Sequence, residues 1–176
     1  YTIRLNASNM AGYDWENKTE YIQVQAPLPV RNINTSESFS TIQGAINAVN
    51  TSTGHIIVVD PGTFNENVVV TKSITIRSSS EDPSETVIQA ANTNNNVFDV
   101  SVANVNISGF TIKGATGTDK AGIYLHASTC KVINDIVTSN NRGLMIDYGD
   151  NAIITSSAII QNNAHGIYLY RSSNVN

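Results

Sequence analysis

Three short stretches decide the fold, and they read Gly122-Ile123-Tyr124-Leu125, Gly143-Leu144-Met145-Ile146 and Gly166-Ile167-Tyr168-Leu169. Their glycines recur at intervals of 21 and 23, and polar turns recur in phase with them, at 139–141 and 161–163. Repeats with such a period are typical of solenoid proteins. A leucine-rich repeat is excluded by the 5 Leu of the whole chain. Short strands separated by Asn, Ser and Gly turns therefore predict one coil of a parallel β-helix for each repeat.

The composition agrees with an all-β protein. The chain has 176 residues and a net charge of −4, and only 14% of its residues are charged, against roughly 25% in soluble domains. Asn, Ser and Thr together number 58, and Ile and Val together number 37. Branched side chains suit a pleated surface better than a helix, and the uncharged polar residues suit turns. The mild acidity gives no support for nucleic-acid binding, and no apolar run approaches the roughly 18 residues of a membrane span.

Stacking explains how such coils are stable. One coil cannot bury its inward residues alone, so successive coils are expected to lie about 4.8 Å apart. Ile and Val would fill the interior, while Asn at the bends tolerates a left-handed backbone and can bond along the stack. Gly122, Gly143 and Gly166 are predicted where a bend enters a strand.

The outward side of the repeated strand holds the candidate site. Strand alternation puts Ile123 and Leu125 inside and Tyr124 and His126 outside. The same register predicts two outward columns that together form a ligand-binding face: Tyr124–Met145–Tyr168 and His126–Asp147–Tyr170. The alternative is that exposed Tyr residues on a sheet are simply good cross-strand packing.

Residues 36–50 carry the one convincing helical pattern. Its apolar face consists of Phe39, Ile42, Ala45, Ile46 and Val49. Ser38 or Ser40 can cap the helix, Gln43 fits a capping box with Ser40, and Thr53-Gly54 ends it. Strands are predicted next at 55–59, 68–70 and 74–76.

The stretch 1–25 has a different pattern. Two predicted strands, 1–7 and 19–24, flank a turn at 9–12. The run from Tyr1 to Val24 resembles the last two strands of a PKD domain, a β-sandwich module of cell-surface proteins. Two prolines, Pro27 and Pro29, indicate a linker. We therefore expect a PKD-like end at 1–25, a linker at 26–31 and a β-helix at 32–176, with further domains of the same chain on both sides.

The β-helix part also resembles a known superfamily. The run Phe39-Ser40-Thr41-Ile42-Gln43 and the later Pro61-Gly62-Thr63-Phe64 with Glu66-Asn67 look like the opening of a pectin-lyase-like right-handed parallel β-helix. The Gly-Ile-Tyr-Leu repeat resembles NosD-type β-helix repeats. The resemblance implies an N-terminal capping helix and a polysaccharide on the outer face of one sheet. A PKD module joined to such a β-helix is similar to large proteins of archaeal and bacterial surfaces, including S-layers, which implies an extracellular, cell-surface location.

Catalysis is not predicted for this segment. Glycosidases need two carboxyl groups at a defined separation, and Asp147 is the weak catalytic candidate because Asp150 and Asp135 are expected elsewhere. The opening coil matches the start of pectin methylesterases, but the later catalytic stretches of that family are missing. The alternative is the front part of a polysaccharide lyase or glycoside hydrolase whose catalytic residues lie partly in downstream coils.

Metals, the thiol and the glycosylation sequons complete the candidates. His55, His126 and His165 are far apart, so no metal site is predicted, although turn carboxylates such as Asp147 and Asp150 leave Ca²⁺ as an alternative. Cys130 is expected at an inner corner as a small apolar residue. Five N-x-S/T sequons occur, at Asn6, Asn17, Asn34, Asn50 and Asn106. Asn34 and Asn50, which flank the predicted helix, are the candidates for carrying glycans.

Overall fold

The computed structural model describes the backbone of residues 2–9 and 12–19 and all atoms of residues 27–176. β1 (Thr2–Asn9) and β2 (Gly12–Thr19) pair antiparallel, with Asn9 opposite Gly12. The prediction of a second strand at 19–24 is wrong in its start, because the strand begins directly after the turn. Tyr13 and Trp15, which alternate with polar residues in β2, are residue types that favour strands. Residues 20–26 lie outside the described residues, and the PKD resemblance stays a prediction.

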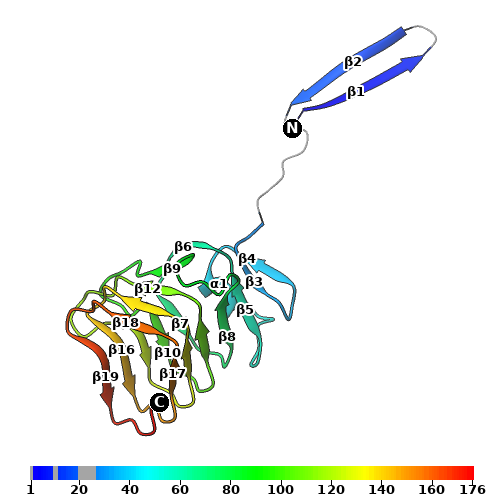
Figure 1. Ribbon diagram of the computed structural model, residues 1–176. Coiled ribbons are helices and arrows are strands. Elements are labelled where there is room, and N and C mark those ends of the chain that lie inside the picture. The colour runs from blue at the N-terminus through cyan, green and yellow to red at the C-terminus, as the bar shows by residue number, and fades with distance from the viewer. Residues whose placement is uncertain (1, 10–11, 20–26) are drawn as a thin grey trace.

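Residues 56–170 wind into five stacked coils, and each coil adds one strand to each of three sheets (Figure 1). Sheet I holds β3 (Val30–Asn32), β4 (Glu37–Phe39), β5 (Ile56–Val59), β8 (Thr75–Ser78), β11 (Asn106–Ser108), β14 (Lys131–Ile133) and β17 (Ile153–Thr155). Sheet II holds β6 (Gly62–Asn65), β9 (Thr86–Gln89), β12 (Thr111–Lys113), β15 (Ile136–Thr138) and β18 (Ala158–Ile160). Sheet III holds β7 (Val68–Val70), β10 (Phe98–Val100), β13 (Ala121–Leu125), β16 (Arg142–Asp147) and β19 (His165–Tyr170).

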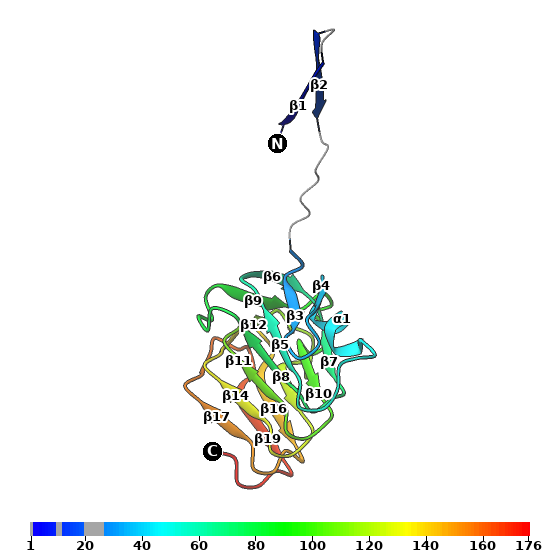
Figure 2. The same cartoon turned by 90° about the vertical axis from the view of Figure 1, so that its right-hand side faces the viewer.

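All neighbours within sheets II and III pair in parallel, as do β5, β8, β11, β14 and β17 of sheet I (Figure 2). The register agrees with the predicted repeat, since Tyr124 lies opposite Met145, and Met145 opposite Tyr168. The predicted all-β parallel solenoid is therefore confirmed.

The interior is filled by inward residues from all three sheets. Fully buried examples are Ile57, Ile76, Ile107, Ile88, Ile112, Val137, Phe98, Ile123 and Leu144. Cys130 lies at an inner corner with no exposed surface, as predicted, and this burial raises the pKa of its thiol.

Polar residues at the bends have two roles: they adopt a left-handed backbone, and they form hydrogen bonds between coils. Asn104, Thr129, Asn151 and Asn174, at the bends that leave sheet III, all have a left-handed backbone, with φ between 52° and 59°. Inside the stack, the buried Asn140 accepts a hydrogen bond from the N–H of Ala115, and Asn162 accepts one from the N–H of Asn140. The predicted bonding of Asn along the stack is thus confirmed.

Gly122 and Gly143 are needed for space rather than for backbone freedom. Both lie near the start of a strand, as predicted, but neither has a positive φ. A Cβ on Gly122 would come within 2.6 Å of Val137 Cγ1, and one on Gly143 within 2.5 Å of Ile159 Cγ2. Side chains of sheet II therefore occupy the room that a larger residue would need.

The cap of the first coil differs from the predicted helix over 36–50. The helix α1 spans only Ile42–Asn47, with Thr41 as N-cap, and Val49 is 92% exposed. Residues 37–39 instead form β4, which pairs antiparallel with β3 and places Phe39 opposite Val30. The predicted box between Ser40 and Gln43 is wrong as well. The N–H groups of Ile42 and Gln43 donate to the Glu66 carboxylate, each at 2.9 Å.

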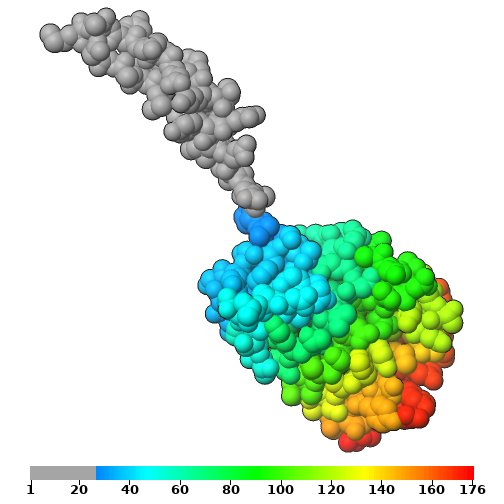
Figure 3. Space-filling view, turned by 180° about the vertical axis from the view of Figure 1, so that it is seen from behind, coloured from blue at the N-terminus to red at the C-terminus, as the bar shows by residue number. Residues whose placement is uncertain are grey.

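The cap packs against the first strands of two sheets. β3 and β4 extend sheet I antiparallel beyond β5. The Gln43 side chain accepts from the N–H of Val69 and donates to its carbonyl, so the amide takes the place of a neighbouring strand beside β7. β3 begins at Val30, within the range expected as linker. Figure 3 shows the cap at one end of the stack and the last coil at the other.

Candidate functional site: the outer face of sheet III

Sheet III presents the predicted columns on its outer side. Tyr124, Met145 and Tyr168 follow one another in register, and Asp147 lies opposite Tyr170. The first column continues into earlier coils, because Tyr124 also lies opposite Asp99, and Asp99 opposite Val69. The side chains of this column are partly exposed, in contrast to the buried Ile123 and Leu125 on either side of Tyr124.

Side chains on this face connect diagonally, from one coil to the next. His126 Nε2 donates to Asp99 Oδ1 at 2.7 Å, and the second Asp99 oxygen accepts from the Asn96 amide at 3.0 Å. The Tyr124 hydroxyl donates to Asp147 Oδ2 at 3.4 Å. The rings of Tyr124 and His126 stack, with centroids 4.6 Å apart and planes 17° apart. Two carboxylates are thus linked through one stacked aromatic pair.

Burial and charge together act on Tyr124. Its pKa is raised above the usual value, chiefly by burial, then by the negative charges of Asp147 and, less strongly, Asp99. The phenol therefore stays protonated and can donate a hydrogen bond throughout the neutral range. Asp147 keeps its other oxygen, Oδ1, buried without a hydrogen-bond partner among the described residues.

A second cluster lies at the start of the strands in coils four and five. The Arg142 guanidinium lies 4.2 Å from the centroid of the Tyr168 ring, and His165 meets the same ring edge-on. Arg142 also pairs with Asp119 and donates to Met145 Sδ. These contacts fix the Tyr168 ring, so its position on the face depends on Arg142 and His165 as well.

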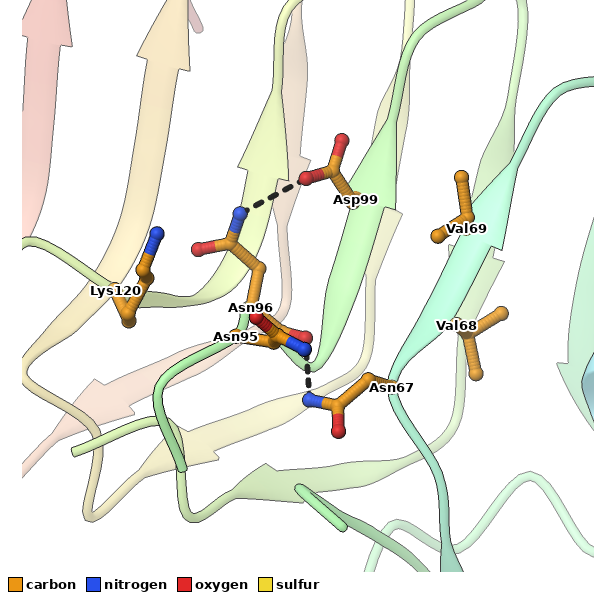
Figure 4. A pocket seen from close by; sticks show the side chains of 7 residues that line it. All are labelled: Asn67, Val68, Val69, Asn95, Asn96, Asp99 and Lys120. Carbon is orange, nitrogen blue, oxygen red and sulfur yellow. Dashed lines mark hydrogen bonds between the residues drawn. The ribbon is translucent and has the colours of Figure 1, made fainter. Parts of the chain in front are cut away.

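A recess opens beside Asp99, toward the first coils (Figure 4). Its volume is about 300 Å³, and its lining consists of Asn67, Val68, Val69, Asn95, Asn96, Asp99 and Lys120. Val69, which is 46% exposed, forms one side, and Lys120 lies at the opposite side, beyond Asn96. The recess therefore combines an apolar wall with amides, a carboxylate and an ammonium group.

Sequence reasoning missed Asp99 and the recess. Coil two has no Gly-Ile-Tyr-Leu motif, and the interval from Asp99 to Tyr124 is longer than the intervals between the later copies of that motif. The alternation Phe98-Asp99-Val100, with both neighbours fully buried, is the signal that could have placed Asp99 on the outer face.

Asp135 and Asp150 do not join this face. Asp135 is buried in the turn between β14 and β15, where one oxygen accepts the N–H of Phe110 at 2.8 Å. Asp150 lies in the turn after β16 and accepts the hydroxyl and N–H of Ser173, both at 2.7 Å. Asp147 is therefore separated from Asp135 and Asp150, as the sequence predicted.

The potential metal ligands are dispersed. Among residues 27–176 and the described parts of the hairpin, no three His, Cys, Asp or Glu side chains come together to hold an ion. Calcium binding by turn carboxylates stays a prediction. In the same part of the chain, no helix is long and apolar enough to cross a membrane.

The sequons are placed very differently. Asn34 is exposed in the turn between β3 and β4, and Asn50 is exposed after α1. Asn106 lies in β11 between Thr75 and Lys131, with its Oδ1 buried. Asn6 and Asn17 lie in β1 and β2, whose side chains are outside the described part.

Together, the fold and this face define a parallel β-solenoid with a partly exposed aromatic and acidic sheet. The chain is similar to a cell surface glycoprotein of Methanothermus fervidus, with 37% identity over 109 residues. That match covers 61% of this chain but only 17% of the relative's length. No family model matches the chain, and no solved structure matches it either.

Proposed function

We propose that this chain is a structural segment of a cell-surface protein. The similarity to a cell surface glycoprotein supports the location. The stacked coils support the structural role, because a solenoid holds its surfaces at fixed distances by nearest-neighbour contacts. Pectin-lyase-like and NosD-type kinship, an S-layer role and the PKD lead-in belong to the same proposal and rest on the sequence resemblances alone.

The outer face of sheet III is proposed to bind a glycan. The observation that carries this proposal is the linked set Asn96–Asp99–His126, stacked on Tyr124, which in turn bonds Asp147. Sugars bind through hydroxyl groups, which carboxylates and amides can bond, and through apolar C–H faces, which aromatic rings cover. The recess of about 300 Å³ is at the lower end of ligand pockets, which suits one sugar unit beside a chain lying across the columns.

Affinity gel electrophoresis tests this function. The protein should be retarded by at least one polysaccharide, and Tyr124→Ala and Tyr168→Ala should each reduce the retardation. Lys113→Ala on the outer face of β12 is the matched control, because it lies on sheet II and should leave the retardation unchanged. Absence of retardation by a broad set of plant, bacterial and archaeal polysaccharides would remove the binding function and leave the structural one.

A second candidate is cleavage of the bound glycan, and Asp99 favours it. Asp99 and Asp147 lie on the same face, on strands two coils apart, and Asp147 is displaced by two residues along the strand from the position in register with Asp99. Inverting glycosidases hold their two carboxyl groups about 6.5–9.5 Å apart, so the two side chains would have to lean toward each other to act as a pair. Release of reducing ends or unsaturated uronides that is lost in Asp147→Asn and in Asp99→Asn would establish this activity. Release by both variants at the wild-type rate would exclude these two acids.

A further inference from the structure

We propose that Asn34 carries an N-linked glycan and that Asn50 and Asn106 remain unmodified. The proposal concerns sugar attached to the chain and is independent of whether sheet III binds sugar. All three asparagines stand in the same N-x-S/T pattern, and the sequence favours Asn34 and Asn50 only by their place beside the predicted helix. The structure distinguishes the three through the exposure of each tripeptide.

The whole sequon at Asn34 is on the surface. Asn34 and Ser36 are exposed, and Thr35 between them is half-buried. The side-chain oxygen of Asn34 accepts the N–H of Ile56 at 2.8 Å, which fixes the amide plane. Since the amide nitrogen lies on the other side of the same carbon and donates to no described residue, it is presented for modification.

The sequons at Asn50 and Asn106 are tied into the core by their middle residues. Thr51 is 3% exposed, and its hydroxyl bonds the carbonyl of Ala45 and the amide of Asn32. Ile107 is 1% exposed in the centre of sheet I. The Asn50 amide nitrogen is also taken, because it donates to Glu37 at 2.8 Å. Neither tripeptide can leave the surface to enter a transferase without local unfolding.

The attachment is an ordinary glycosyl transfer from an activated donor, a glycosyl phosphate or diphosphate carried on a lipid or nucleotide. A bond forms between Asn34 Nδ2 and the anomeric carbon of the sugar. The bond from that carbon to the phosphate oxygen breaks, and the phosphate leaves with the electron pair. One Nδ2 proton passes to a base of the transferase.

The position gives the glycan a role in the fold. Asn34 lies in the turn that leads into β4, and β4 is the outermost strand of sheet I, with its far edge unpaired among the described residues. Free strand edges invite pairing with other chains unless something bulky or charged covers them. A hydrated sugar chain at this turn would keep the edge of β4 from pairing.

Peptide mass spectrometry of the full-length protein, isolated from the cells that produce it, tests the proposal. Combined cleavage after Arg, Lys and Glu isolates Asn34 in the short peptide 32–37, and the peptides 38–66 and 86–113 contain Asn50 and Asn106. We expect sugar mass increments on the first peptide only. Ser36→Ala should abolish them while Asn34 and its bond to Ile56 remain, and Ser52→Ala should change nothing.

Two results would overturn the inference. One is an unmodified 32–37 peptide in the wild-type protein. The other is sugar on the Asn50 or Asn106 peptide at an occupancy similar to that of Asn34, which would show that exposure in the folded state does not select the site.

Discussion

The third and fifth coils contain the identical tetrapeptide Gly-Ile-Tyr-Leu, at 122–125 and 166–169, yet the two copies have different surroundings. Ile123 and Leu125 are 0% and 1% exposed, whereas Ile167 and Leu169 are 45% and 51% exposed. The difference arises because β13 has a neighbour on both sides, β10 and β16, whereas β19 pairs with β16 alone among the described residues. In a stack, the contribution of a residue is therefore set by how many coils contact it, not by its local sequence.

The largest expected effect tests this statement with one substitution made in both copies. Ile123→Ala should lower the free energy of unfolding by about 3–4 kcal/mol, because it leaves a cavity between three coils. In the chain of residues 1–176, Ile167→Ala should cost about 1 kcal/mol or less, since roughly half of the side chain contacts solvent there. Denaturant titration followed by circular dichroism measures both. Equal losses in the two variants would contradict the role of neighbouring coils.

The glycines of the same tetrapeptide sharpen the comparison. A methyl group at Gly122 would meet Val137 and the Asn140 amide at 2.6 Å, whereas one at Gly166 finds Ile159 only at 3.8 Å. Gly122→Ala should therefore cost about 2–3 kcal/mol through overpacking. Gly166→Ala should be neutral, or stabilising by up to about 1 kcal/mol, because alanine restricts the unfolded chain. Thermal unfolding of the two variants measures both effects. A strong loss of stability in Gly166→Ala would contradict the explanation by steric contacts of the added methyl group.

The comparison also shows what the sequence could predict. Period and alternation were sufficient for the coils, the interior and the register of Tyr124, Met145 and Tyr168, because alternation is local and the intervals between these three coils are similar, 21 and 23 residues. The helix was predicted too long, because its apolar spacing continues to Val49, a residue that no coil covers. Asp99 was missed because its neighbours on the face, Tyr124 and His126, belong to the next coil. The interval from Asp99 to Tyr124 is longer than the intervals between the later coils. Distances across coils of unequal length cannot be read from a fixed period.

The capped end offers a third test. Glu66 receives two N–H groups at the start of α1, and Gln at this position keeps only one oxygen and directs an amide toward the other donor. Glu66→Gln should cost about 1–2 kcal/mol. It should also promote self-association, detected by light scattering, as the edge of β7 becomes accessible. Glu85→Gln, an exposed residue in the loop before β9, is the control and should have no effect. A Glu66→Gln variant as stable and monomeric as the control would show that the helix does not depend on this carboxylate.

The smallest effect concerns one turn position that differs between coils four and five. Asp135 Oδ1 accepts the N–H of Phe110 of the preceding coil, and Ser157 Oγ accepts the N–H of Asp135 in the same way. Burial raises the pKa of Asp135 well above its usual range, although the N–H groups of Phe110, Ile133 and Gly109 act in the opposite direction. Its second oxygen has no partner among the described residues.

Because the folded state holds this proton more tightly than the unfolded chain, the stabilising contribution of Asp135 is complete below the unfolded pKa of about 4. It is lost as the pH rises through the raised pKa of the folded state. Asp135→Asn keeps an oxygen for Phe110 and cannot ionise, so its free energy of unfolding should match that of the wild type at pH 4 and exceed it by about 1 kcal/mol at pH 8.

Asp150→Asn is the contrasting variant. Two hydrogen bonds from Ser173 lower the pKa of Asp150, so the wild type should lose this contribution as the pH falls, and removing it should weaken the protein at neutral pH only. Denaturant midpoints of the three proteins between pH 3 and pH 8 measure both trends, and parallel curves for Asp135→Asn and the wild type would show that the buried carboxyl is ionised without cost.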